Sequence, residues 1–314
     1  TNYQRVIAST SNWHTSATQN SDDSWSYTIP TAIPSTYLTP YNNTSDFGSG
    51  DGELSGTALL SGTYTVGMQC YKTYYGANAA TYRDVGNATK DFLFGSATTI
   101  EAREVVKTTN CNTCHVTLQF HGGSRRDVKL CVLCHTSGSE DSNSSVDRDL
   151  DGDIDDTDKT RYFTIDFRVM IHKIHNAARL PSVLGVSTNS DGSRNYAATP
   201  APYRRAASSG FTDFSDIVFP VWPNLTTAMP RDTGYSSLSS ANKTLEGSML
   251  TGATKCSKCH GDPDGSGSAT APSQGTLAYT QPTRRACGSC HDDIVWTYPY
   301  VANGQTMAAQ ANDS

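Results

Sequence analysis

Four copies of the motif C-x-x-C-H constrain this chain more than any other feature of its sequence. The copies are Cys111-Asn-Thr-Cys114-His115, Cys131-Val-Leu-Cys134-His135, Cys256-Ser-Lys-Cys259-His260 and Cys287-Gly-Ser-Cys290-His291. In c-type haem attachment, the two sulfurs form thioethers to the two vinyl groups of one porphyrin, and the adjacent histidine reaches the iron from that side. The sequence therefore predicts four covalently attached haems c.

Paired cysteines have two other common uses, zinc ribbons and disulfides. The first two C-x-x-C pairs are about 20 residues apart, which a zinc ribbon tolerates, but a ribbon does not need a histidine after every second cysteine. Covalent haem is attached on the oxidising, exported side of the membrane. We therefore expect a protein exported through the periplasm to the cell surface or the extracellular space.

The histidines match the number of axial positions. Beside the four motif histidines, the chain has four more and none to spare: His14, His121, His172 and His175. Four haems with two axial positions each need eight imidazoles, so we predict bis-histidine ligation of all four. The alternatives are that a histidine is an ordinary core or surface residue, above all the isolated His14, or that a methionine such as Met170 replaces one.

The run from residue 166 to 183 predicts a short amphipathic helix that carries His172 and His175. At i and i+3 the two imidazoles lie on one helix face, about 5 Å apart. They are too close to take both sides of one planar haem, so we predict that they bind two different haems. His121 is followed by Gly122 and Gly123, which allow a tight turn against a haem face.

Bis-histidine ligation indicates electron transfer rather than an enzyme, because a six-coordinate iron has no position open to substrate. Three hypotheses follow. The chain is a subunit of a conductive extracellular filament, a monomeric periplasmic or surface electron carrier, or a multihaem reductase with one open haem. The third becomes possible if His14 is not a ligand.

The composition predicts a weak side-chain core. Only 36% of the 314 residues are apolar, so we expect a mostly irregular fold with a few short helices and small strands, organised around the haems. The alternating run at 62–75 predicts such small strands. We expect one haem-wrapped domain of three segments: 1–100, loop- and strand-rich with a role in subunit contact; 101–200, with the first haem pair; and 201–314, loop-rich with the second.

Charge and hydropathy exclude two classes of partner. The net charge of −6 is spread along the chain and forms no basic stripe for nucleic acid. No apolar run approaches the roughly 20 residues that cross a bilayer, so we expect no membrane span. Thr1 does not open a signal peptide, so we expect a mature, already processed form.

An acidic run, DRDLDGDIDDTD, resembles a calcium-binding loop in which Asp replaces the final Glu. The candidate calcium ligands are Asp147, Asp149, Asp151, Asp153 and Asp158; the alternative is a solvated acidic loop. The ninth cysteine, Cys70, is expected to be a buried, inert thiol, the alternative being an intermolecular bond.

With HGGSRRD between the first two motifs and MIHKIH downstream, residues 111–180 resemble the outer-surface multihaem cytochromes of metal-reducing bacteria. The tetrahaem design with an isolated N-terminal histidine resembles the filament-forming, OmcS-like cytochrome nanowire family. That resemblance implies identical subunits in a helical homopolymer, in which a histidine of one subunit completes a haem of the next. For this chain it implies that His14 is the intersubunit ligand, with redox partner cytochromes and extracellular electron acceptors as further partners.

Overall fold

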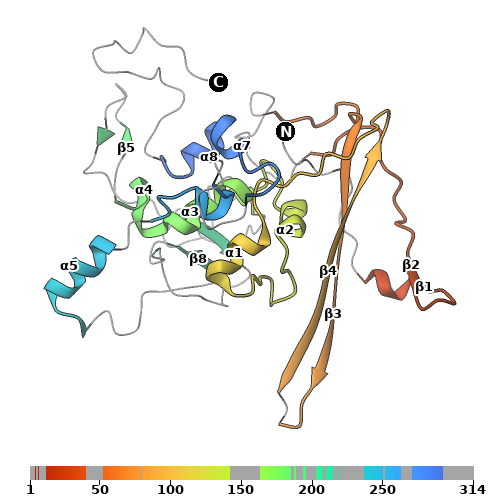
Figure 1. The fold of residues 1–314 in the computed structure, drawn as a ribbon, viewed down its shortest axis with the longest axis horizontal. Helices are drawn as coiled ribbons and strands as arrows, with labels where there is room; N and C mark the ends of the chain where they lie inside the picture. The colour runs from red at the N-terminus through yellow and green to blue at the C-terminus, as the bar shows by residue number, and fades with distance from the viewer. Residues whose placement is uncertain are drawn as a thin grey trace, which may run out of the picture.

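The structure is a computed structural model, and it describes residues 4, 6, 12–39, 52–78, 80–141, 163–184, 187–188, 194–195, 203–207, 210–214, 219, 237–249, 252–262 and 271–292. Short helices and two-stranded sheets are joined by irregular chain in these ranges (Figure 1), which confirms the predicted fold class. The helices are η1 (Trp13–Thr15), α1 (Thr108–His115), α2 (Val128–Cys134), α3 (Phe167–Asn176), η4 (Ala177–Arg179), α4 (Pro181–Leu184), α5 (Ser240–Met249), α6 (Ser257–His260), α7 (Leu277–Thr280) and α8 (Arg284–Gly288). The strands are β1 (Thr18–Gln19), β2 (Trp25–Ser26), β3 (Gly62–Tyr75), β4 (Thr81–Phe94), β5 (Ser187–Thr188), β6 (Arg194–Asn195), β7 (Arg204–Ala207) and β8 (Gly210–Asp213).

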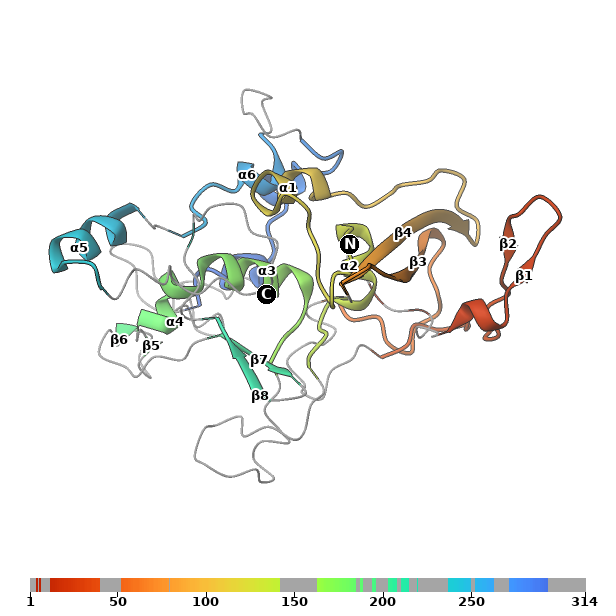
Figure 2. The ribbon, with the colours of Figure 1, turned by 90° about the horizontal axis from the view of Figure 1, so that it is seen from below.

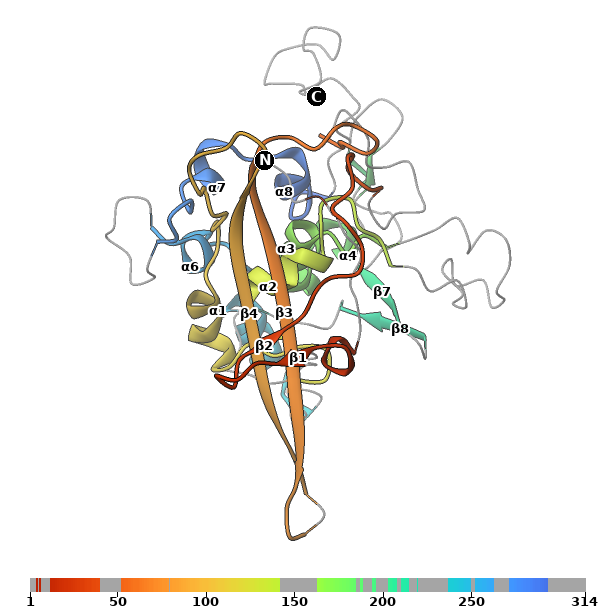
Figure 3. The same cartoon turned by 90° about the vertical axis from the view of Figure 1, so that its right-hand side faces the viewer.

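The largest regular unit is the antiparallel hairpin of β3 and β4, which stands beside the helices (Figures 1 and 3). Its strands pair without interruption from Gly62 with Phe94 to Tyr75 with Thr81. The hairpin is much longer than the small strands expected from the sequence. The difference arises because the second run, 81–94, alternates in the same way and can pair along its whole length.

One face of the hairpin packs on α2, and Gly67 makes the approach possible. A Cβ at Gly67 would lie 2.8 Å from Cδ1 of Leu130 and would also meet Leu133, so any other residue there would force both leucines to shift. Beside this contact, the side chain of Asn87 donates a hydrogen bond to the carbonyl of Ser124 at 2.9 Å. The opposite face of the hairpin is exposed.

The side-chain core is small. Its main cluster joins Ala177 and Leu180 to Tyr203 and Phe214, whose rings stack at 5.6 Å; Met170, Ile174 and Val183 pack against it. In the described part of the chain, no helix is long and apolar enough to cross a membrane.

The predicted helix at 166–183 is divided into three pieces. α3 begins after Asp166, whose side chain accepts a hydrogen bond from the backbone N–H of Arg168, and it ends at Asn176. A 3₁₀ turn follows, and Leu180 is extended because a residue before proline disfavours the helical region. Pro181 then opens α4.

Candidate haem sites

The four motifs bring their functional side chains together through a helical turn. We call them site 1 (Cys111–His115), site 2 (Cys131–His135), site 3 (Cys256–His260) and site 4 (Cys287–His291). Site 1 lies within α1. In sites 2, 3 and 4 the backbone N–H of the histidine donates to the carbonyl of the first cysteine, at 3.0, 2.9 and 2.9 Å. Residues i, i+3 and i+4 of such a turn lie on one side, so both sulfurs and the imidazole can meet one porphyrin.

Three motif histidines each face a second histidine from elsewhere in the chain. The ring centres are 6.1 Å apart for His115 and His175, 6.0 Å for His121 and His135, and 6.1 Å for His172 and His260. The structure therefore places His172 and His175 opposite two different motifs, sites 3 and 1.

These separations suit an iron between two imidazoles. A metal–imidazole bond is about 2.0 Å and the ring centre lies about 1.1 Å beyond the bonding nitrogen, so trans imidazoles have ring centres about 6.2 Å apart. The interplanar angles of 78°, 40° and 37° are all compatible, because an imidazole can rotate about its bond to the metal. Since a porphyrin supplies the four equatorial nitrogens, two protein ligands per iron complete the coordination. The residues present therefore fit haem.

Hydrogen bonds select the nitrogen that is available to a metal. The Nδ1–H of His135, His175 and His260 donates to the carbonyl of Ile165, Ile171 and Val105, at 2.8, 2.8 and 3.1 Å. A backbone carbonyl can only accept, so Nε2 carries the free lone pair in these three imidazoles. This is the orientation that outer-shell hydrogen bonds impose on metal-binding histidines.

Burial keeps the imidazoles neutral. It lowers the pKa of His121 and of His172 to about 4, with the charges of Arg125 and His260 respectively as the next causes. Burial also lowers the pKa of His135, His175 and His260. At neutral pH these rings are unprotonated and can act as ligands.

The loop that carries His121 turns in the left-handed region. His121, Gly122 and Gly123 have φ values of 51°, 70° and 81°. Glycine adopts this region without strain, which explains the two glycines after the histidine. The side chain of Arg83 on β4 donates to the carbonyl of Gly122 at 2.9 Å and holds the turn against the hairpin.

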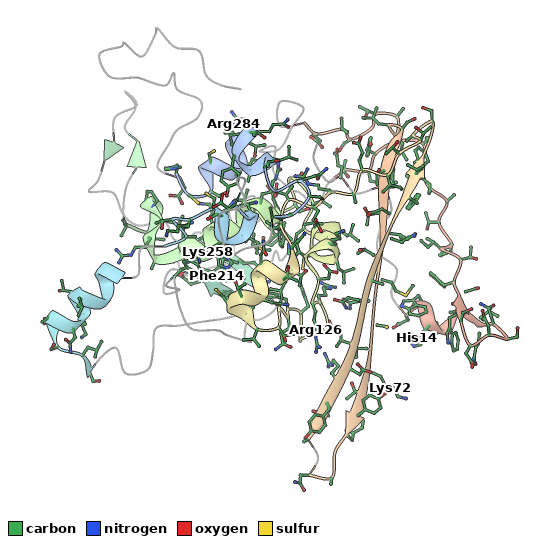
Figure 4. All side chains as sticks on the ribbon, in the orientation of Figure 1. His14, Lys72, Arg126, Phe214, Lys258 and Arg284 are labelled. Atoms are coloured by element: carbon green, nitrogen blue, oxygen red, sulfur yellow. The ribbon has the colours of Figure 1, made fainter. Side chains whose placement is uncertain are left out.

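His14 and His291 are the two histidines that face no other histidine among the described residues, and both are exposed. His14 lies on η1, whose Trp13 donates from Nε1 to the carbonyl of Gln69 on β3 at 3.5 Å. In Figure 4, His14 and Arg284 on α8, the helix that leads into site 4, are far apart, with the hairpin between them.

The remaining candidates have different outcomes. The predicted calcium ligands lie outside the described residues; they are Asp147, Asp149, Asp151, Asp153 and Asp158. No disulfide joins any of the nine cysteines. The expectation that Cys70 is buried was wrong: Cys70 lies on the exposed face of the hairpin, because even-numbered residues of β3 point away from α2.

Contacts that hold the sites in place were not evident from the sequence. Asn110 is buried and donates to the carbonyl of Cys259 at 2.9 Å. Lys173 forms an ion pair of 2.6 Å with Asp292, next to His291. Both contacts join residues more than 100 positions apart in the chain; the position of Lys173 between two histidines was the one local signal.

Residues 103–313, about two thirds of the chain, match a family described as outer membrane cytochrome MtrC/MtrF-like, domains II/IV. A stretch of 56 residues is 46% identical to the multihaem cytochrome MtrC of Shewanella baltica. That stretch is 17% of this chain and 8% of the length of the relative. The similarity is to surface cytochromes, as the motifs predicted, and the filament-forming family is not among these matches.

Proposed function

The chain belongs to the outer membrane cytochrome MtrC/MtrF-like family, and from this premise we propose that it is a cell-surface electron carrier with four covalently attached haems. The observation that carries the proposal is the set of three imidazole pairs at 6.0–6.1 Å, each with one member from a C-x-x-C-H motif. Bound haem supplies one-electron redox chemistry at an iron that two imidazoles keep six-coordinate.

The residues of the chain prepare sites 1, 2 and 3 for that chemistry. The motif turns present the sulfurs, the backbone carbonyls orient Nε2 of three imidazoles, and burial keeps the imidazoles neutral. If two histidines hold the iron at sites 1, 2 and 3, little geometry would change when its oxidation state changes, which would favour rapid electron exchange with redox partner cytochromes and extracellular acceptors.

Haem content and spin state test this proposal. The purified protein should contain four haems per chain, and its ferric EPR spectrum should show at least three of them as low-spin. His121→Ala should convert one haem to high-spin, while an alanine at the exposed His14 should leave sites 1, 2 and 3 low-spin. Fewer than four haems, or a spectrum that His121→Ala leaves unchanged, would refute the assignment.

A second candidate function is a filament subunit, and the exposure of His14 and His291 favours it. Each of these imidazoles is exposed and can meet the other in a second copy, and His14 lies across the hairpin from Arg284, on the helix that leads into site 4 (Figure 4). A head-to-tail contact of that kind repeats and generates a helical homopolymer unless it closes into a ring. His14 of one copy would then be the distal ligand at site 4 of the next.

Negative-stain microscopy with EPR separates the two candidates. A filament subunit should give fibres and an all-low-spin spectrum, and His14→Ala should abolish the fibres and make one haem high-spin. A monomeric carrier should give single particles in both proteins. Single particles with one high-spin haem in the unmodified protein would leave site 4 open to an external ligand, as in the reductase hypothesis. Calcium binding at Asp147–Asp158 remains a prediction from the sequence.

A further inference from the structure

We infer that the four attachment sites follow one another in space in the order 2, 1, 3, 4, and that α3 is the element that joins the N-terminal pair of sites to the C-terminal pair. The inference rests on the proposed function in that it requires haems at these sites. The order differs from the order along the sequence, and it identifies sites 2 and 4 as the ends of the array.

Sites 2 and 1 are linked through the starts of their helices. Thr108, the first residue of α1, donates from its hydroxyl to the carboxylate of Asp127 at 3.0 Å, and it accepts from the backbone N–H of Val128 at 3.0 Å. Asp127 is the N-cap of α2. The N-terminus of one motif helix is therefore bonded to that of the next.

Sites 1 and 3 meet directly, although about 150 residues separate them in the chain. The buried side chain of Asn110 on α1 donates to the carbonyl of Cys259 at 2.9 Å. Cys111 of site 1 also lies near Cys259 of site 3 and Cys131 of site 2.

Sites 3 and 4 are linked through the end of α3. The amide of Asn176 donates to Sγ of Cys290 at 3.0 Å, and its oxygen accepts from the backbone N–H of Ala253, three residues before site 3, at 3.2 Å. Cys256 of the third motif lies near Cys290 of the fourth.

α3 touches all four sites in its ten residues. The backbone N–H of Phe167 donates to the carbonyl of His135 in site 2 at 3.2 Å. Farther along, His175 faces site 1, His172 faces site 3 and Lys173 pairs with Asp292 beside site 4. Figure 2 shows α3 in the middle of the molecule, with α1 and α6 on one side of it.

As a consequence, the N-terminal pair of sites (1 and 2) meets the C-terminal pair (3 and 4) at one place, between sites 1 and 3. With haem at all four sites, electrons would pass between site 2, beside the hairpin, and site 4 by way of sites 1 and 3, whose second histidines, His175 and His172, are three residues apart on α3. Asn110 is a positioning residue at this crossing, since it joins α1 to α6 without being a ligand.

A set of methionine variants tests the order at equilibrium. Methionine in place of a distal histidine raises the reduction potential of that haem and gives it a distinct ferric absorption spectrum. His121→Met marks site 2, His175→Met marks site 1 and His172→Met marks site 3. The midpoint reduction potential of a marked haem is measured in the double variant and in the single variant. The difference between the two values measures the interaction of the two sites.

The order predicts which pairs interact. The midpoint potentials of sites 1 and 3 are compared in His175→Met with His172→Met, and those of sites 2 and 3 in His121→Met with His172→Met. The shift between sites 1 and 3 should be at least about twice the shift between sites 2 and 3, because charge interactions weaken with distance. Sites 2 and 1 should also interact strongly. Equal or stronger interaction between sites 2 and 3 than between sites 1 and 3 would overturn the order.

Ligation is checked first, so that a failure of the proposed function can be distinguished from a failure of the proposed order of sites. If any single variant keeps the unmodified spectrum and spin state, its histidine is not a ligand and the proposed function fails. If methionine does not bind the iron, alanine at the same positions gives high-spin haems, and the broadening of their EPR signals replaces the midpoint shift. Broadening must then be greater for sites 1 and 3 than for sites 2 and 3; the reverse overturns the order.

Discussion

Removal of Lys173 should destabilise the protein far more than removal of a comparable surface cation. Lys173 Nζ lies 2.6 Å from Oδ2 of Asp292, and the two side chains are 17% and 9% exposed. Breaking a fully buried pair costs about 3–5 kcal/mol; because the lysine is partly hydrated, we expect about 2–3 kcal/mol for Lys173→Met. The control is Arg204→Met, which removes the 3.0 Å pair with the 40% exposed Asp213 and should cost about 0–1 kcal/mol.

The assay is urea unfolding, followed by tryptophan emission, which haem quenches in the folded protein, with linear extrapolation of the free energy of unfolding. The double variant Lys173→Met with Asp292→Leu should be less destabilised than Lys173→Met alone, because the carboxylate that Lys173 neutralises is then removed as well. The reasoning is refuted if Lys173→Met costs no more than Arg204→Met, or if the double variant is the least stable of all.

Four further outcomes follow from the described contacts and the sequence. His121→Ala should convert the haem of site 2 to high-spin, seen by ferric EPR at low temperature, with all four haems still attached. Gly67→Val should cost about 1–3 kcal/mol in urea unfolding because its side chain would overlap α2, whereas Gly62→Val, which meets nothing within 4 Å, should be near neutral; equal costs would contradict the packing. The haem-loaded protein should react with one equivalent of a thiol reagent at the exposed Cys70, and titration of more than one thiol would mean incomplete attachment. Calcium at about 100 times its dissociation constant should add about 2.7 kcal/mol of stability, measured by calorimetry, and Asp149→Asn should remove that gain.

Local signals in the sequence predicted the local parts of the structure. The motif spacing corresponds to the helical turns of α1, α2, α6 and α8, and the glycines after His121 adopt positive φ. The low apolar content agrees with the small core around Leu180 and Phe214. These features depend on backbone geometry within a few residues, so a single sequence contains the necessary information.

Contacts between residues far apart in the sequence could not be predicted from local patterns. The histidine count indicated that His172 and His175 serve different haems, but which motif each one faces depends on how loops of many residues bring α1 and α6 to α3. The contact between Asn110 and Cys259 has no local signature for the same reason. The length of the hairpin was missed because only one of its two strands was identified, and strand length depends on the partner.

The order in which the chain leaves the membrane gives α3 a further significance. His121 and His135 belong to one short segment, so site 2 can be completed as soon as that segment has been exported. His175 follows His115 by a long stretch of chain, and His172 precedes His260 by a longer one, so sites 1 and 3 acquire their second ligand at different stages of biogenesis. If haem is attached during export, site 1 would lack its second ligand, His175, until α3 emerges, so the helix that joins the two halves would also be the stage at which assembly is most open to error.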